Sequence, residues 1–184
     1  MQRPVLHHVE DWKKPALIVF DLDFTLWPFR VDKSAKSPFS VSKKGNVIDV
    51  RGRVFKTFPE VSQLLMTLTS NGYNLAVASR IKDIPGAYQL LQLFGIMQYF
   101  QYKEIYPSVK TVHFYQLRRK TGIEFDRMIF FDDDRRNVRD VSRLGVTRSQ
   151  AHIKHCSHHK IVSILSYVMP EKFACTKIQK AYEI

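Results

Sequence analysis

The sequence predicts a doubly wound α/β domain with a mostly parallel, Rossmann-like sheet. Short apolar runs alternate with segments whose apolar residues recur at helical spacing, which is the pattern of βαβ units. The first run, Leu17–Phe20, is continuously apolar, as expected for a strand buried on both faces. It ends abruptly in Asp21 and Asp23, which would lie at the sheet edge where open α/β folds bind ligands.

Strands and helices are expected to alternate through most of the chain. The expected strands are Ala16–Asp21, Tyr73–Ala78, Tyr99–Ile105, Arg127–Phe131 and a weaker one at Val146–Ile153. Pro59–Glu60 opens the first expected helix and Asn71–Gly72 closes it, because proline is tolerated in a first turn and glycine follows a last one. The other expected helices are Pro85–Phe94, Val109–Thr121 (with Val112, Tyr115 and Leu117 as apolar positions), Asn137–Leu144 and Ile161–Met169.

Residues 30–56 interrupt this alternation. They are rich in Ser, Lys, Gly and Val, and Gly45–Asn46 separates Phe39–Ser42 from Val47–Val50, which predicts a β-hairpin. An excursion of this length is typical of a lid or binding loop rather than an ordinary connection. We therefore expect a small flap at about residues 30–56.

Length and composition indicate one globular unit. The 184 residues fit one domain, with a core at about 16–169 and a basic tail at about 170–184. With 45% hydrophobic residues the chain can bury a core, which excludes a disordered tail. The net charge of +12 suggests either polyanionic or phosphorylated partners, or a basic solvated surface without a dedicated partner.

The expected compartment is the cytoplasm. Cys156 and Cys175 form neither a CxxC pair nor a regular framework, which favours a reducing setting. The N-terminal residues lack the apolar centre of a signal peptide, and no window has the roughly 18 apolar residues of a membrane span. The sequence leaves the oligomeric state open.

Polar side chains follow three of the expected strands. They are Asp21 and Asp23, then Ser79 and Arg80, then Asp132–Asp134. Because parallel strands end at one edge, these groups can converge, and clustered carboxylates call for a hard cation such as Mg²⁺. An aspartate can also attack phosphorus, and Ser79 with a lysine, for which Lys110 is well placed, would stabilise the phosphoryl group.

The motifs resemble those of the haloacid-dehalogenase-like hydrolases. The stretches DLDFTLWPF, AVASR, KEIYPSVKTVHF and MIFFDDDRRN are similar to its magnesium-dependent phosphatase branch, which has no large cap domain. The resemblance covers about residues 16–147. It implies a Mg²⁺-dependent phosphate monoester hydrolase that works through an aspartyl-phosphate.

The resemblance also implies catalytic and substrate-binding roles. Asp21 would be the nucleophile, and Asp23 the general acid that then becomes the general base. Ser79 would bind the transferring phosphoryl group, Lys110 would neutralise it, and Arg80 would help to hold the substrate.

The implied metal ligands are Asp21, the backbone carbonyl of Asp23, and Asp133. Asp132 would lie beside them, either on the metal or in support of its ligands. Thr25 would steady the turn after the first strand. The chain departs from the family pattern in its basic flap, in Asp134 and Arg135, and in residues 148–184, and these departures leave the substrate preference open. Because a small cap leaves the site open, the resemblance implies protein phosphotyrosine or small sugar phosphates as substrates.

Two other functions are compatible with parts of the sequence. A phosphoserine protein phosphatase of the same superfamily shares the DLDxTL motif. A basic nucleic-acid-binding protein on an inactive phosphatase scaffold would explain the charge, but the cations are spread along the chain and no nucleic-acid-binding module is recognisable.

Two local features have competing interpretations. The histidine-rich stretch HIKHCSHH, from His152 to His159, is better explained as a solvated polar loop than as a zinc site, because no second ligand cluster exists. Trp27 and Phe29 are either aromatic walls of the substrate pocket, which the WPF match slightly favours, or packing residues beneath the flap.

Overall fold

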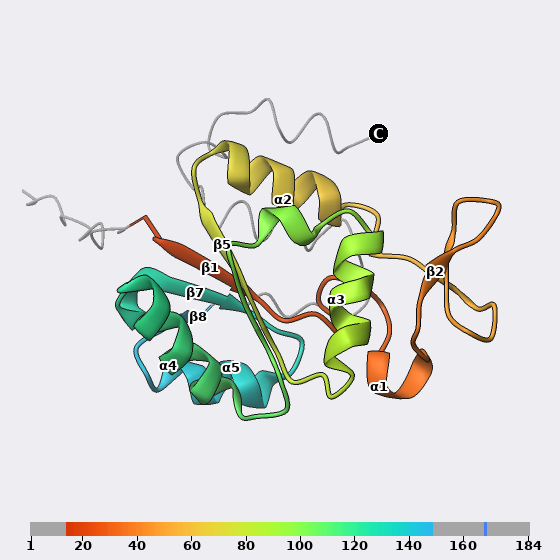
Figure 1. Cartoon of the computed structure of the whole chain (residues 1–184). Helices are drawn as coiled ribbons and strands as arrows, with labels where there is room; N and C mark the ends of the chain where they lie inside the picture. The colour runs from red at the N-terminus through yellow and green to blue at the C-terminus, as the bar shows by residue number, and fades with distance from the viewer. Residues whose placement is uncertain (1–13, 149–167, 169–184) are drawn as a thin grey trace, which may run out of the picture.

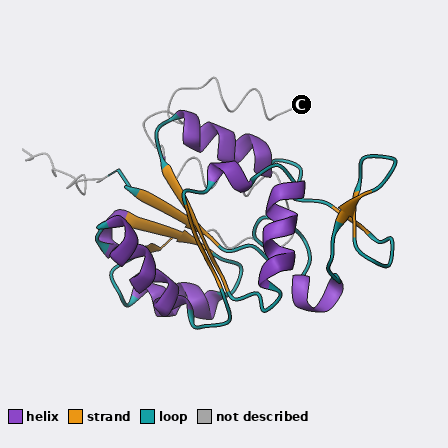
Figure 2. Cartoon of the chain, viewed as in Figure 1, coloured by secondary structure: helices purple, strands orange, loops and turns teal. Residues whose placement is uncertain are grey.

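In the computed structural model of the chain, a parallel sheet lies between two layers of helices (Figure 1; Figure 2). The structure describes residues 14–148 and 168. The strands of the main sheet are β1 (Leu17–Phe20), β5 (Asn74–Ser79), β6 (Tyr102–Ile105), β7 (Met128–Phe131) and β8 (Thr147–Arg148). The helices are α1 (Val31–Ser34), α2 (Val61–Ser70), α3 (Ile84–Leu93), α4 (Lys110–Thr121) and α5 (Arg135–Ser142), with 3₁₀ turns η1 (Met97–Tyr99) and η2 (Phe125–Arg127).

The sheet has the strand order β6-β5-β1-β7-β8, and all its pairings are parallel. The chain leaves β1 for β5 on one side and returns to β7 on the other, so β1 lies at the point where the winding reverses. At its end, Phe20 is paired with Val77 and Phe131. The predicted doubly wound fold is confirmed, and the residues after β1 emerge at the switch point where such folds bind ligands.

Strand β1 is apolar throughout because both faces of the sheet are covered. Ile18 and Phe20 pack in the cluster that contains α2 and α3. Leu17 and Val19 pack in the opposite cluster, with residues of α4 and α5. Each buried side chain of this size contributes about 1.5–3 kcal/mol. Burial on both faces therefore fixes the strand from which Asp21 projects.

Helix α4 covers the sheet with a narrower apolar face than the sequence suggested. Leu117 is buried as expected, together with Phe114. Val112 and Tyr115, which were expected among its apolar positions, are exposed by 39% and 53%. The reason is that the buried face also takes in two polar residues, Lys110 and His113.

The excursion between β1 and α2 contains α1 and a separate antiparallel sheet of β2 (Ser40–Val41), β3 (Val47–Ile48) and β4 (Val54–Phe55). The predicted hairpin across Gly45–Asn46 is confirmed. The third strand and α1 were not predicted, because elements this short carry no periodicity. The second turn is held by Asp49, whose carboxylate accepts hydrogen bonds from Arg51 N (2.9 Å) and Arg53 N (3.0 Å).

Other predicted elements differ at their ends. The strand expected at Tyr99–Ile105 is shorter, because its first residue belongs to η1. The strand expected at Val146–Ile153 is seen as β8, and the rest of it lies outside the described residues. So do the histidine-rich stretch, the basic tail and all of the helix expected at Ile161–Met169 except Val168, which is helical and buried. Within the described part of the chain, no helix combines the length and apolarity that a membrane crossing requires.

Candidate active site

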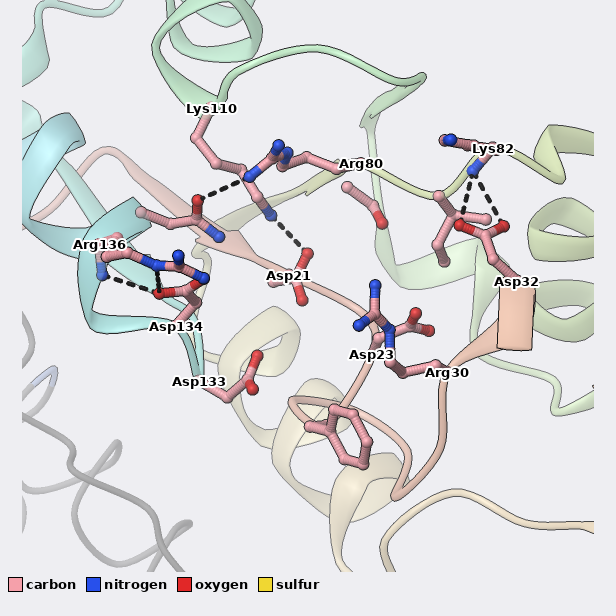
Figure 3. A pocket seen from close by; sticks show the side chains of 14 residues that line it. Asp21, Asp23, Arg30, Asp32, Arg80, Lys82, Lys110, Asp133, Asp134 and Arg136 are labelled. Carbon is pink, nitrogen blue, oxygen red and sulfur yellow. Dashed lines mark hydrogen bonds and ion pairs between the residues drawn. The ribbon is translucent and has the colours of Figure 1, made fainter. Parts of the chain in front are cut away.

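The polar strand ends meet in one cavity of about 420 Å³ at the carboxyl edge of the sheet (Figure 3). Asp21 follows β1, Ser79 ends β5, and Lys110 is the first residue of α4. The cavity is lined by these residues and by Asp23, Phe24, Arg30, Asp32, Arg80, Ile81, Lys82, Asp133, Asp134, Arg136 and Asn137. The residues expected to be catalytic, to bind substrate or to hold the metal (Asp21, Asp23, Ser79, Arg80, Lys110 and Asp133) therefore all lie in its wall, together with several that the sequence did not single out.

A buried lysine forms the centre of the site. Lys110 is 3% exposed, and its Nζ donates hydrogen bonds to Asp21 Oδ1 and to the carbonyl of Ala78. The same Nζ lies 3.0 Å from Asp132 Oδ2. Burial disfavours the ammonium charge, but the two carboxylates hold the pKa of Lys110 above its usual value. Lys110 is therefore a fixed positive charge beside Asp21.

Three carboxylates gather around this lysine. Oxygen atoms of Asp21, Asp132 and Asp133 all lie within 4.8 Å of one another. Burial raises the pKa of Asp21 to about 7, against the attraction of Lys110 and with a further rise from Asp132. Burial and Asp132 also raise the pKa of Asp133. Carboxylates that repel one another in this way fit a hard cation, and an all-oxygen donor set suits Mg²⁺.

Asp132 is held by its neighbours. Asp134 N donates to its Oδ1 (2.7 Å), and Asn137 Nδ2 donates to its Oδ2 (3.0 Å), which is also the oxygen beside Lys110. These contacts orient Asp132 and, through it, Lys110. Asn137 was not predicted as a site residue, although its position in the first turn of α5, five residues after Asp132, was a signal.

Asp23 faces a different environment from the other carboxylates. Trp27 Nε1 donates to its Oδ1 (2.8 Å), and Val31 N lies within 3.3 Å of both its oxygens. Burial raises the pKa of Asp23 to about 6, and the bonds from Trp27 and Val31 limit that rise. Its side chain is not part of the group of three carboxylates. A carboxyl with this pKa can hold or release a proton near neutral pH.

The aromatic wall of the cavity is not the one favoured by the sequence. Trp27 is fully buried and stacks on Phe29, with ring centroids 5.6 Å apart. Phe29 in turn packs edge-on against Phe55 of the flap, so both rings lie beneath the flap. The expectation that they line the pocket is wrong. Phe24 lines it instead, 41% exposed and with a positive φ of 58°, a strained backbone conformation of the kind often found at functional sites.

The turn after β1 is closed by the backbone of Thr25, whose N–H donates to the carbonyl of Leu22 (3.1 Å). The buried hydroxyl of Thr25 has no hydrogen-bond partner among the described residues. Thr25 therefore closes the turn after β1 through its backbone N–H, whereas its hydroxyl makes no hydrogen bond to the described residues.

A buried histidine ties α4 to the end of β5. His113 Nε2 lies 3.0 Å from the carbonyl oxygens of Ser79 and Tyr106, and its Nδ1 lies 3.0 Å from the carbonyl of Val109. Its ring stacks on Tyr106 at 4.3 Å. These contacts set the position of Ser79 relative to the helix that carries Lys110. The signal missed in the sequence was a polar residue three positions after Lys110 on the buried face of α4.

Cations surround the mouth of the cavity. Arg136 pairs with Asp134 (2.9 Å), and Arg80 Nη1 donates to Asn137 Oδ1 (3.4 Å). On another side, the Asp32 carboxylate of α1 accepts hydrogen bonds from Lys82 N and Asp83 N, each at 3.1 Å. Asp32 thereby joins α1 to the loop after β5, although the two segments are 50 residues apart in sequence.

Comparison with known proteins connects this geometry to phosphatases. The acid phosphatase family profile matches residues 13–158. The chain is 54% identical over 133 residues to the human protein named magnesium-dependent phosphatase 1, a match that covers 72% of this chain and 76% of the relative. It is also 35% identical over 150 residues to a HAD-like hydrolase superfamily protein of Schizosaccharomyces pombe, which covers 76% and 87% of the two chains.

Solved structures share the fold at low sequence identity. The N-terminal phosphatase domain of BF1531 from Bacteroides fragilis, in complex with Mg, matches with a TM-score of 0.61 and 17% identity over 84% of this chain and 40% of that one. A protein described as a predicted phosphoglycolate phosphatase from Haemophilus somnus matches with a TM-score of 0.55 and 17% identity over 74% and 84% of the two chains. At this identity, the likeness shows the fold.

Proposed function

The chain belongs to the acid phosphatase family and is a Mg²⁺-dependent phosphatase of the haloacid-dehalogenase-like superfamily, and from this we propose that it hydrolyses phosphate monoesters through an aspartyl-phosphate on Asp21. The observation that carries the proposal is the Asp21 carboxylate, nearly buried, hydrogen-bonded by Lys110 and open to the cavity. Lys110 keeps one oxygen of Asp21 oriented, which leaves the other free to attack.

The metal would be held by Asp21, Asp133 and the backbone carbonyl of Asp23, with Asp132 beside them. When bound, Mg²⁺ supplies positive charge that offsets the carboxylates and the phosphoryl oxygens. Ser79, at the end of β5, and Arg80 would bind the phosphoryl oxygens on the side of the cavity near Lys110. Charge stabilisation of this kind is the main source of catalysis in phosphoryl transfer.

The reaction would proceed in two displacements. An Asp21 oxygen attacks phosphorus, the bond from phosphorus to the leaving oxygen breaks, and protonated Asp23 donates its proton to that oxygen. Asp23, now ionised, then takes a proton from water as the water oxygen attacks phosphorus. The bond between phosphorus and the Asp21 oxygen breaks, which releases inorganic phosphate and restores both carboxyl groups. The pKa of Asp23, raised to about 6, suits both duties.

The proposed substrates are protein phosphotyrosine and small sugar phosphates. The flap is a small three-stranded sheet with one short helix, and the cavity keeps an open mouth lined by Phe24 and by cations. An aromatic leaving group could pack against Phe24, whereas a sugar could hydrogen-bond with the polar rim.

Hydrolysis of 4-nitrophenyl phosphate tests the chemistry. We expect turnover with MgCl₂, none with EDTA, and a loss on the order of 10⁴-fold or more in Asp21→Asn. Asp126→Asn, in η2 and outside the cavity lining, is the matched control and should keep wild-type activity. Undiminished activity in EDTA, or substantial turnover by Asp21→Asn, would overturn the proposal.

A further inference from the structure

Three cations that line the cavity lack a carboxylate within ion-pair distance in the part of the chain that the structure describes. They are Arg30, Arg80 and Lys82. Arg136, which also lines the cavity, differs because Asp134 neutralises it. All four side chains belong to exposed residues at the mouth of the cavity (Figure 3). Unpaired cations at the mouth of a cavity raise the local concentration of anions.

Not all of this charge is needed for the phosphoryl group. The carboxylates of Asp21, Asp132 and Asp133 would be balanced by Lys110 together with a Mg²⁺ ion held among them. The phosphoryl group brings its own negative charge, and Arg80 is the rim cation on its side, since it follows Ser79 directly and contacts Asn137. Arg30 and Lys82 remain as cations that the transferring phosphoryl group does not require, and the Asp32 carboxylate on their side of the cavity is hydrogen-bonded by Lys82 N and Asp83 N.

These two cations lie on the side of Asp23. Arg30 immediately precedes Val31, whose N–H donates to Asp23, and its charge acts on the Asp23 carboxyl. Lys82 is tied to the same region by the hydrogen bond from its N–H to Asp32. Figure 3 shows Arg30 next to Asp23, and Lys82 next to Asp32. Asp32 thus joins the two backbone segments that carry Arg30 and Lys82.

We propose that Arg30 and Lys82 form a second anion-binding subsite, and that the preferred substrate is a small phosphate monoester whose leaving group carries a carboxylate or a second phosphate. The inference rests on the proposed function, because Asp23 marks the leaving-group side only if it protonates the leaving oxygen. A cavity of about 420 Å³ is within the range of small-molecule sites. The anionic group would make charge-assisted hydrogen bonds to Arg30 and Lys82.

Matched substrate pairs test this inference. The first pair is 4-carboxyphenyl phosphate and its neutral counterpart 4-carbamoylphenyl phosphate, and the second is propane-1,3-diol bisphosphate and 3-hydroxypropyl phosphate. We expect wild-type kcat/KM to be about tenfold or more higher for the anionic member of at least one pair, and the preference to shrink as salt is added. The pair with the larger ratio distinguishes a carboxylate from a phosphate.

Substitutions of Arg30 and Lys82 test whether these two cations cause the preference for anionic substrates. The ratio within the favoured pair should fall several-fold in Arg30→Gln and in Lys82→Gln, and approach one in the double variant. Arg119→Gln, an exposed residue of α4 outside the cavity lining, should keep the wild-type ratio. A ratio near one in the wild type, or a ratio unchanged in the double variant, would overturn the inference.

Two further outcomes separate this inference from competing accounts. Mg²⁺-dependent hydrolysis of the neutral substrates, without any anionic preference, would refute the subsite and leave the proposed function intact. No hydrolysis of any substrate would refute the proposed function itself. A higher kcat/KM for an acidic phosphotyrosine peptide than for every small anionic substrate would contradict the small-molecule assignment.

Discussion

The two sides of the cavity differ in how they are built. The phosphoryl side comes from strand ends and the start of α4, and its central residues, Asp21, Ser79 and Lys110, are buried. The leaving-group side comes from the residues that follow β1 and from the loop after β5, and its cations Arg30 and Lys82 are exposed. The sheet thus positions the groups proposed for the chemical step, whereas loops position those that would contact the leaving group.

Because of this difference, we expect substitutions to be tolerated better on the exposed side of the cavity than on the buried side. Removing a partner from the buried side leaves an uncompensated charge in the core, which costs both stability and catalysis. Changing the exposed side should alter selectivity and pH dependence at little cost in stability, because exposed groups can be solvated. Four substitutions can test the contrast.

The largest combined effect is expected for Lys110→Met. It leaves Asp21 and Asp132 close together without their shared cation, so we expect a loss of about 3–5 kcal/mol in the free energy of unfolding without Mg²⁺. The same change should lower kcat by about 10²–10³-fold. Urea unfolding in EDTA and steady-state kinetics measure the two effects.

The control is Arg119→Met on the exposed face of α4. It should change stability by about 0.5 kcal/mol or less. If Lys110→Met proves as stable as this control in EDTA, the buried side is not held together by charge.

Asp23→Asn should act on the proton transfer. We expect kcat/KM for an alkyl phosphate to fall about 10²–10⁴-fold, and that for 4-nitrophenyl phosphate to fall less, because nitrophenolate leaves without a proton. A saturating Mg²⁺ concentration favours the ionised form of Asp21, whose pKa is otherwise raised to about 7. Since the acid must be protonated and its pKa is about 6, wild-type kcat/KM for the alkyl phosphate should under these conditions decline above about pH 6. This decline should be absent in the variant, and its persistence would assign the general acid to another group.

The same residue predicts a pH dependence of stability in EDTA. The folded protein holds a proton on Asp23 up to about pH 6, whereas the unfolded chain releases it near 3.8. Because the folded state binds more protons in this window, the free energy of unfolding should fall as pH rises from about 4 to about 6. Wild type should therefore lose about 2–3 kcal/mol more than Asp23→Asn over this window. If the free energy of unfolding has the same pH dependence in the wild type and in Asp23→Asn, the pKa of Asp23 is not raised in the folded protein.

Asp32→Ala should weaken the exposed side without touching the buried one. It removes the acceptor of the Lys82 and Asp83 N–H groups, so we expect about 1–2 kcal/mol of destabilisation. The preference for anionic leaving groups should fall several-fold, while the loss of kcat with a neutral aryl phosphate stays within about threefold. Asp126→Ala is the control, and equal losses with both kinds of substrate would mean that Asp32 does not organise a separate subsite.

The smallest effect is expected for Trp27→Phe. It removes the bond from Nε1 to Asp23, and because that bond stabilises the carboxylate, the pKa of Asp23 should rise. The pH above which kcat/KM for the alkyl phosphate declines should therefore be higher than in the wild type. The free energy of unfolding should fall by about 1–2 kcal/mol. If kcat/KM for the alkyl phosphate instead begins to decline at a lower pH than in the wild type, Asp23 is not the group whose ionisation causes the decline.

The sequence contained most of the information on the buried side. The run Leu17–Phe20 can be apolar throughout only if both sheet faces are covered, and that places Asp21 at the switch point. Ser79 and Lys110 follow from the same rule applied to the neighbouring strands. Because strand ends converge in any parallel sheet, residues far apart in sequence could be assigned to one cavity.

The exposed side was less predictable because it depends on loop geometry. The hydrogen bond from Lys82 N to the Asp32 carboxylate spans 50 residues and joins two segments without periodicity. For Trp27 the sequence slightly favoured the pocket wall over packing beneath the flap, but its ring is buried in the core and its Nε1 donates to Asp23. Proximity to a motif does not show which way a loop side chain points. Nothing in the sequence around Phe24 predicted its positive φ.

The most direct test of the central claim is to trap the phosphorylated enzyme. Protein mixed with Mg²⁺ and a fast substrate is quenched in acid within the first turnover, digested with pepsin and sequenced by tandem mass spectrometry. We expect a phosphate on the peptide that contains Asp21, at Asp21 itself, and we expect hydroxylamine to remove it because it is an acyl phosphate. Phosphate on another residue, or rapid turnover without any phosphorylated peptide, would contradict it.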